Sequence, residues 1–322
     1  MTTFIDPSKW LTFIEQEYLG SFVRDGGAAI KFAVPVNEGS ASQLFEGLTR
    51  LASGAGYAVI KISAADTRIH MADEIFFRTA EQVPWQILSR KFIAKLAADL
   101  GYQWVECTDG PIYLQLAEAN RVDPQMLLLD LKKSIGNTVF RERRLSRDFR
   151  VAMTHLCIAE LSGGQDGATT VRILTDWLTG RNKAVSAVKP YHIFRKINRT
   201  TARFFFESMV RWVRATSPPG MVLLLDAQRV MLARNPHDLG IFYSKAAVLD
   251  TYEVLRQFID SASDLDGFFM VVVPDIPFLE DHGRGISAYE ALKFRVFDEI
   301  RDRNLVNPMA SLARVVGAAS GV

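Results

Sequence analysis

The chain of 322 residues contains only two cysteines, Cys107 and Cys157, and their separation matches no metal-binding spacing. Such sparse cysteine usage is typical of a reducing compartment, so we predict a cytoplasmic protein. No stretch reaches about 18 uninterrupted apolar residues, the length that begins to span a bilayer, and no membrane segment is predicted. The opening residues, MTTFIDPSKW, lack the basic and apolar regions of a signal peptide.

An excess of charge of one sign is also absent, because 38 basic residues nearly balance 36 acidic residues. The chain as a whole therefore generates no field that would draw it onto nucleic acid, and a nucleic-acid site must come from local clustering. The five histidines show no ligand spacing, and neither a zinc-protease motif nor a serine-hydrolase motif occurs. These absences leave metal catalysis and nucleophilic catalysis without candidate residues.

The most informative stretch that is present covers residues 220–227, where an apolar run ends on Asp226. A continuously apolar strand is typical of a parallel sheet that is covered on both faces. A lone acid at the tip of such a strand is typical of the Walker B strand of P-loop NTPases, whose Asp holds Mg²⁺. An active ATPase of this class usually has Glu at the next position, whereas this chain has Ala227, which can activate no water.

Strand and helix patterns alternate at both ends of the chain. The periodicity predicts strands over residues 28–34, 57–63, 220–226 and 267–275. It also predicts a loop over 36–41, a helix over 42–53 and two later helices over 244–261 and 286–303. Strands that alternate with helices favour a parallel sheet flanked by helices, with ligands beyond the carboxyl ends of the strands.

Between these α/β segments the pattern is almost entirely helical. The predicted helices cover residues 72–81, 85–100, 111–134, 144–161, 170–178 and 199–215, with a loop over 162–167. The sequence therefore predicts a split α/β core, formed by residues 1–70 and 217–305, that contains a helical insertion over residues 71–216.

Five blocks of the chain carry a resemblance to a known family. They are residues 36–73 (which include Thr67-Arg68-Ile69-His70), 220–227, 252–260, 274–296 and 307–308. In this order and spacing the chain resembles the ATP-binding proteins of BREX antiphage systems, the BrxC/BrxD group. The resemblance implies an AAA+-like, P-loop NTPase-like fold and a place in a bacterial defence complex. It also implies that residues 306–322 begin a C-terminal portion that is missing or truncated here.

The chain departs from that family at the Walker A loop. The family's motif places Pro35 at the first Gly, Ser40 at the second Gly, Ala41 at the Lys and Ser42 at the hydroxyl position. In a working loop, backbone amides cradle the phosphates and the Lys neutralises their charge. Pro35 has no amide proton and Ala41 has no cation. These departures predict a pseudo-ATPase that acts in assembly or DNA association within the defence complex, with no cofactor expected.

An active motor with an unorthodox site is the alternative. In that hypothesis Ser40, Ser42, Asp226 and Asp275 contact ATP, and Ser42 and Asp226 hold Mg²⁺. A structural role is the competing interpretation at each position: a helix N-cap for Ser42, a strand-end acid for Asp226 and a turn acid for Asp275.

Two arginines, Arg284 and Arg295, are candidate contacts with a neighbouring subunit. That subunit belongs either to a homo-oligomer or to another protein of the defence complex. Surface ion pairs are the alternative role for both side chains.

Two basic clusters are candidate DNA contacts, which gives a third hypothesis, a DNA-binding adaptor. Phosphate contact by such clusters is independent of base sequence and sensitive to salt. The alternative is a solvated helix face whose charges pair with Glu142 and Asp148. Phe194 and Ile197 have helical spacing and are predicted to lie in the core. The candidate contacts are Arg141, Arg143, Arg144 and Arg147 in the first cluster, and Arg195, Lys196 and Arg199 in the second.

Overall fold

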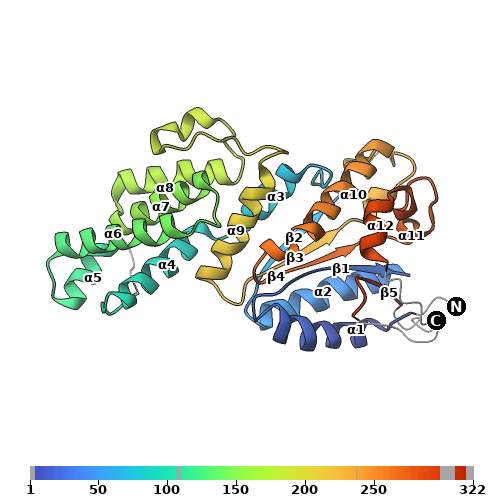
Figure 1. The fold of residues 1–322 in the computed structure, drawn as a ribbon, viewed down its shortest axis with the longest axis horizontal. Helices are drawn as coiled ribbons and strands as arrows, with labels where there is room; N and C mark the ends of the chain where they lie inside the picture. The colour runs from blue at the N-terminus through green and yellow to red at the C-terminus, as the bar shows by residue number, and fades with distance from the viewer. Residues whose placement is uncertain (1–3, 107–109, 237, 298–308, 317–322) are drawn as a thin grey trace. The chain divides into compact units, whose positions relative to one another are not determined.

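The computed structural model describes residues 4–106, 110–236, 238–297 and 309–316 (Figure 1). Cys107, His237 and the 307–308 block lie outside these residues. The chain divides into two compact units: Met1–Thr79 together with Pro218–Val322 form the first, and Ala80–Ser217 form the second. Across the described ranges, no helix is both long and apolar enough to cross a membrane.

The first unit is built on a sheet of five strands. They are β1 (Ala28–Pro35), β2 (Ala58–Ser63), β3 (Met221–Asp226), β4 (Phe268–Val273) and β5 (Leu312–Val315). Their order in the sheet is β2-β3-β4-β1-β5, and every pairing is parallel. This parallel sheet and its flanking helices confirm the predicted α/β, P-loop NTPase-like fold class.

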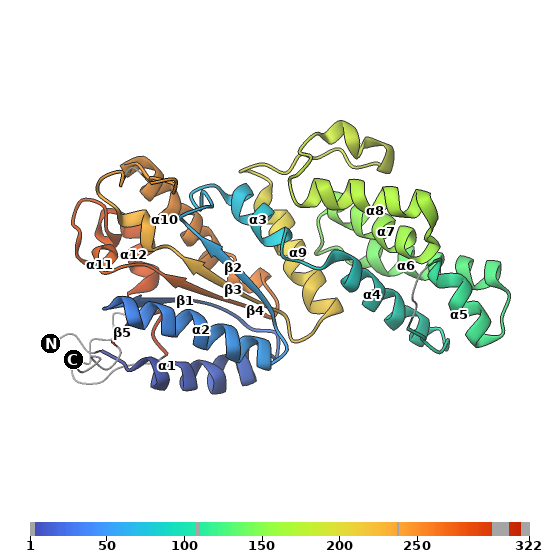
Figure 2. The ribbon, with the colours of Figure 1, turned by 180° about the vertical axis from the view of Figure 1, so that it is seen from behind.

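Helices cover both faces of the sheet, which explains why β3 and β4 are apolar at almost every position. One face carries α1 (Pro7–Phe13), which continues as a π-helix over Ile14–Phe22, and α2 (Glu38–Gly54) (Figures 1 and 2). The other face carries α10 (Lys245–Asp260) and α12 (Glu290–Val296). The core beneath α1 and α2 includes Trp10, Leu44, Leu48, Val222 and Phe269, all 0% exposed. Burial of each such side chain contributes roughly 1.5–3 kcal/mol.

Gly220 allows β3 to start close to β4. Its φ is +136°, and an added Cβ would lie 2.0 Å from the carbonyl oxygen of Gly267. Any side chain at this position would therefore push the two central strands apart. The glycine that begins the informative apolar run thus has a packing role.

Strand β5, which has no predicted counterpart in the sequence, forms an edge of the sheet beside β1. Phe32 and Pro35 of β1 are in register with Leu312 and Val315 of β5. The buried Lys31 holds the segment before β5, because its Nζ donates hydrogen bonds to the carbonyl oxygens of Met309 and Ala310. The same Nζ lies 4.5 Å from the centroid of the Tyr18 ring.

The second unit is helical. Its main helices are α4 (Trp85–Asp99), α5 (Ile112–Asn120), α6 (Pro124–Arg141), α7 (Arg147–Ser162), α8 (Gly164–Leu178) and α9 (Ala202–Thr216), and α3 (Ala72–Ala80) leads into it. The long helix predicted over 111–134 is wrong, since Arg121 takes a left-handed conformation and Asp123 caps a new helix. The loop predicted over 162–167 is also wrong, because Gly163 alone turns the chain between α7 and α8.

The end of the first unit differs from the predicted helix over 286–303. A short helix α11 (Pro277–Glu280) follows β4, and a 3-10 turn over Ile286–Ala288 precedes α12. Helix α12 ends at Val296, where Phe297 leaves the helical conformation. Residues 298–303 of the predicted helix lie outside the described part of the chain.

Candidate functional site

Strand β1 runs almost directly into α2 at the position where the resemblance placed a phosphate-binding loop. Only Val36 and Asn37 separate the two elements, because β1 ends at Pro35 and α2 begins at Glu38. The predicted loop over 36–41 is therefore wrong. Two local contacts explain the short connection. The backbone amide of Val36 donates to the carbonyl oxygen of Val315 at 2.9 Å, and Asn37 caps the helix.

The Asn37 side chain occupies the start of α2. Its Oδ1 accepts a hydrogen bond from the backbone amide of Ser40 at 2.8 Å and another from the Ser40 hydroxyl. A helix N-terminus attracts phosphates through unsatisfied amides of this kind. Asn37 was not a candidate in the sequence, although Asn before a helix is a common N-cap signal.

The other positions that the resemblance assigned to the Walker A loop lie inside α2. Ser40 is 1% exposed and Ala41 is 7% exposed, so both are buried in the first turns of the helix. Ser42 follows on the exposed surface of α2. The interpretation of Ser42 as the N-cap is wrong, because Asn37 has that role.

Asp226 lies at the end of β3, and both of its carboxylate oxygens accept hydrogen bonds within the chain. The Ser63 hydroxyl donates to Oδ2 at 3.0 Å, and the backbone amide of Gln228 donates to Oδ1 at 3.1 Å. Ser63 ends β2 and pairs in register with Asp226. Ser63 was not among the candidate site residues predicted from the sequence. Its position at the end of a predicted strand was the signal that could have indicated it. Ala227 is 4% exposed.

Asp275 follows β4, the strand between β3 and β1. It is half-buried, and its Oδ1 has no hydrogen-bond partner among the described atoms. Burial raises the pKa of this carboxyl to about 6. Burial and the nearby charge of Asp275 both raise the pKa of the Tyr252 hydroxyl. Asp275 is thus a carboxyl whose protonation changes near pH 6.

Arg284 is held inside the first unit. Its Nη2 donates to the carbonyl oxygen of Tyr243 at 2.7 Å, and the Tyr252 hydroxyl donates to the carbonyl oxygen of Arg284 at 2.7 Å. The buried Tyr243 hydroxyl in turn lies 2.7 Å from the carbonyl oxygen of Thr67 and accepts from the amide of Ile69. The 67–70 segment of the first block and the 274–296 block of the resemblance are therefore connected through Tyr243.

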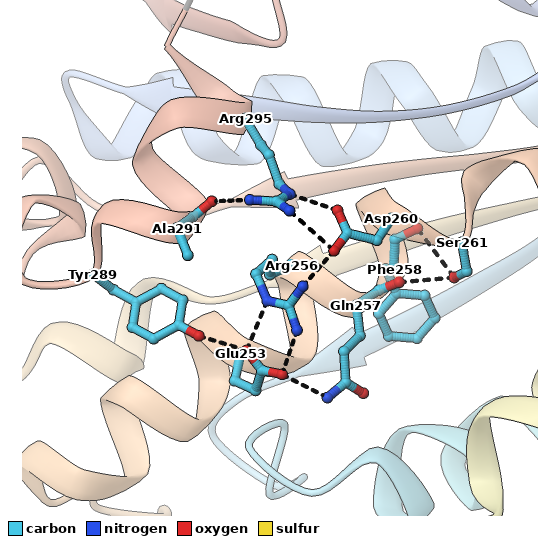
Figure 3. A network of polar contacts seen from close by, with 9 residues as sticks. All are labelled: Glu253, Arg256, Gln257, Phe258, Asp260, Ser261, Tyr289, Ala291 and Arg295. Atoms are coloured by element: carbon cyan, nitrogen blue, oxygen red, sulfur yellow. Dashed lines mark hydrogen bonds and ion pairs between the residues drawn. The ribbon is translucent and has the colours of Figure 1, made fainter.

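Arg295 belongs to a polar network between α10 and α12 (Figure 3). Its guanidinium donates to both carboxylate oxygens of Asp260 and to the carbonyl oxygen of Ala291. Arg256 also pairs with Asp260 and donates to Glu253, which lowers the pKa of Glu253 to about 2. The network connects the 252–260 block to the 274–296 block. Tyr289 and Gln257 complete it through hydrogen bonds to Glu253.

The two basic clusters of the sequence meet at the start of α7 in the second unit. Asp148 is 7% exposed, and its Oδ1 accepts hydrogen bonds from the backbone amides of Phe194 at 2.7 Å and Arg195 at 3.0 Å. The prediction that Phe194 lies in the core is wrong, because its side chain is 54% exposed, whereas Ile197 is buried. All seven candidate DNA contacts are exposed: Arg141, Arg143, Arg144, Arg147, Arg195, Lys196 and Arg199.

Residues 117–316 match the family model described as BREX system ATP-binding protein BrxC/D. No curated protein and no solved structure matches the chain. The matched region includes Asp226, Asp275, Arg284 and Arg295, and it begins after the β1–α2 connection. Because the match covers more than half of the 322 residues, this chain belongs to the BrxC/D family of BREX system ATP-binding proteins.

Proposed function

We propose that this chain is a catalytically impaired, ATPase-like component of its phage-defence complex and acts in assembly. Membership of the BrxC/D family places it in the BREX system. The observation that carries the proposal is the capping of α2 by Asn37 directly after β1. A phosphate-binding loop needs several residues with inward-pointing amides and a Lys. The connection of Val36 and Asn37 offers neither.

The residues at the end of the sheet do not fit a Mg-nucleotide. The Ser40 hydroxyl donates to Asn37, and the Asp226 carboxylate accepts from Ser63 and Gln228. Ser42 lies on the exposed surface of α2, beyond the first turn. An active motor would need these groups to converge on one cation, and it would need a cation to replace the missing Lys. This arrangement supports no hydrolytic step.

A protein-docking role is supported by the surface of α12. Phe294 is 67% exposed and lies next to Arg295 in the sequence, whose side chain is 36% exposed. Exposed aromatic and arginine side chains are typical anchors of protein interfaces. We propose that Phe294 and Arg295 contact a second copy of this chain or another protein of the complex.

Nucleotide binding is tested by thermal unfolding with millimolar Mg-ATP or a non-hydrolysable analogue. Any ligand at 100 times its Kd would add about 2.7 kcal/mol to the folded state and raise Tm. We expect no rise, and no phosphate release by the chain alone or with other BREX proteins. A rise in Tm that Asp226→Asn abolishes would instead support the active motor.

Assembly is tested by size exclusion with light scattering, and by capture of other BREX proteins. We expect the native chain to self-associate or to capture another BREX protein. The F294A/R295A variant should lose whichever of these interactions the native chain shows. Phe22→Ala is the matched control, because Phe22 is 50% exposed and lies in the same unit. A native chain that stays monomeric and captures nothing would contradict the assembly role.

A further inference from the structure

We propose that the second unit carries a binding surface for single-stranded nucleic acid around the start of α7. The surface, here called the α7 platform, consists of residues 140–147 and 194–204. It lies within Ala80–Ser217 and shares no residue with the nucleotide position of the first unit. Its failure would therefore leave the impaired-ATPase proposal unchanged.

Internal hydrogen bonds bring the two segments of the platform together. Asp148 accepts from the amides of Phe194 and Arg195. From α9, the Ser208 hydroxyl accepts from the backbone amide of Ser146 at 2.8 Å. Arg211 donates to the carbonyl oxygen of Arg144 at 2.9 Å. Within the two segments these anchors use backbone groups, so they leave the outward side chains of both segments available.

The platform is basic, and its acids are already engaged. Residues 194–203 contain four basic and no acidic side chains. In the first segment Glu142 pairs with Arg144 at 3.2 Å, and on α9 Glu207 pairs with Arg203 at 2.8 Å. Within the described ranges, no ion pair or side-chain hydrogen bond engages these five exposed cations: Arg141, Arg143, Arg147, Arg195 and Lys196. Such cations bind phosphates and release counterions.

Three phenylalanines are exposed on the same platform. Phe140, Phe194 and Phe204 are 51%, 54% and 48% exposed. Phe140 accepts at its carbonyl from Arg150 of α7, and Phe204 accepts at its carbonyl from Ser208, so both backbones are close to the anchors. Full burial of a Phe side chain contributes roughly 1.5–3 kcal/mol to the stability of the fold. Because these three side chains are about half exposed, each contributes less than that.

Cations combined with exposed rings favour a single strand over a duplex. The bases of a single strand can stack on aromatic rings while the phosphates contact Arg and Lys. The bases of a duplex are stacked on each other and would leave the rings unused. DNA and RNA single strands share this chemistry, so the choice between them is an outcome of the test.

The experiment is fluorescence anisotropy with labelled single-stranded DNA, single-stranded RNA and duplex DNA of matched length, at several salt concentrations. We expect at least one single strand to bind more tightly than the duplex. The R143A/R147A variant should make the negative slope of log affinity against log salt shallower by about 1.4, since each lost phosphate contact removes about 0.7. The K9A/R50A variant removes two exposed cations from the first unit and should change nothing.

A second pair of variants tests the rings. The F194L/F204L variant keeps apolar side chains and should weaken single-strand binding by roughly fivefold or more, because each stacked base contributes about 1–3 kcal/mol. It should leave duplex binding unchanged, and Phe22→Leu is the control. The proposal is overturned by preferential duplex binding, by an affinity indifferent to the rings, by equal effects of the control variants, or by no binding.

Discussion

The side-chain oxygen of Asn37 accepts the hydrogen bond of the Ser40 backbone amide, at the start of the helix where a working P-loop would hold phosphate. The same oxygen accepts from the Ser40 hydroxyl. A residue from the chain itself therefore satisfies a donor that an ATPase reserves for its ligand.

The Asn37→Ala variant should lose this cap and reduce the free energy of unfolding by about 1 kcal/mol. Asn37→Asp is the matched control, because a carboxylate caps a helix equally well and interacts favourably with the helix dipole. Urea denaturation of the three proteins measures the difference. Equal stability of the alanine and native proteins would show that the cap does not stabilise α2.

Asp275 should make stability depend on pH in the acidic range. Its folded pKa of about 6 exceeds the unfolded value of about 3.9, so the folded state binds more protons between these values. Stability therefore falls as pH rises from about 4 to about 6 and remains reduced above that range. At neutral pH the Asp275→Asn variant should have a free energy of unfolding about 1–2 kcal/mol higher than the native protein. This value allows for the partial exposure of the Asp275 side chain.

Chemical denaturation across pH measures the Asp275 effect, and Asp281→Asn is the control. Hydrogen bonds from the amides of Gly283 and Arg284 lower the pKa of Asp281, so this substitution should destabilise at neutral pH. If both variants shift stability in the same direction, the burial of Asp275 is not the cause.

Lys31 should produce the opposite slope in the basic range. Burial lowers its pKa to about 8, whereas the unfolded value is about 10.4. Between these values the unfolded state binds more protons, so stability rises with pH by at most about 1.4 kcal/mol per pH unit. The Lys31→Met variant should lack this rise. Lys61→Met, at an exposed position of β2, should retain it, and a rise retained in Lys31→Met would contradict the assignment.

Arg295 and Asp260 should be energetically coupled. Their two hydrogen bonds join α12 to α10, although both side chains are about one third exposed. A double-mutant cycle with Arg295→Ala and Asp260→Ala should give a coupling of about 0.5–1 kcal/mol. Asp260→Ala should lower the free energy of unfolding more than Arg295→Ala, because Asp260 also pairs with Arg256. Strict additivity would mean that the contact does not stabilise the fold.

The strands of the core were predictable because burial on both faces leaves a direct pattern in the sequence. Residues 220–226 and 267–275 are apolar runs, and they form the adjacent strands β3 and β4. Strand β5 leaves no such pattern, since Leu312–Val315 is short and contains Arg314. Its place depends on pairing with β1, about 280 residues earlier in the chain, which no local pattern encodes.

The candidate site shows the same division. Ser42 had the residue type and spacing of a helix cap. The N-cap of α2 is Asn37 instead, because its side chain accepts the hydrogen bond of the Ser40 amide. Phe194 and Ile197 had helical spacing, yet the segment is not helical, and only Ile197 is buried. Periodicity therefore failed where a side chain from a distant segment, Asp148, holds the backbone instead.

The sequence by itself determined which chemistry is absent. The resemblance assigns Ala41 and Ala227 to the positions of the Walker A cation and the Walker B base, and no fold can give a methyl group a charge or a proton-accepting atom. The tertiary structure decided which of the remaining groups meet. It paired Asp226 with Ser63, buried Lys31 beneath the segment before β5, and joined two basic segments about 50 residues apart. Side-chain chemistry is a property of each residue, whereas proximity depends on how buried strands and helices pack.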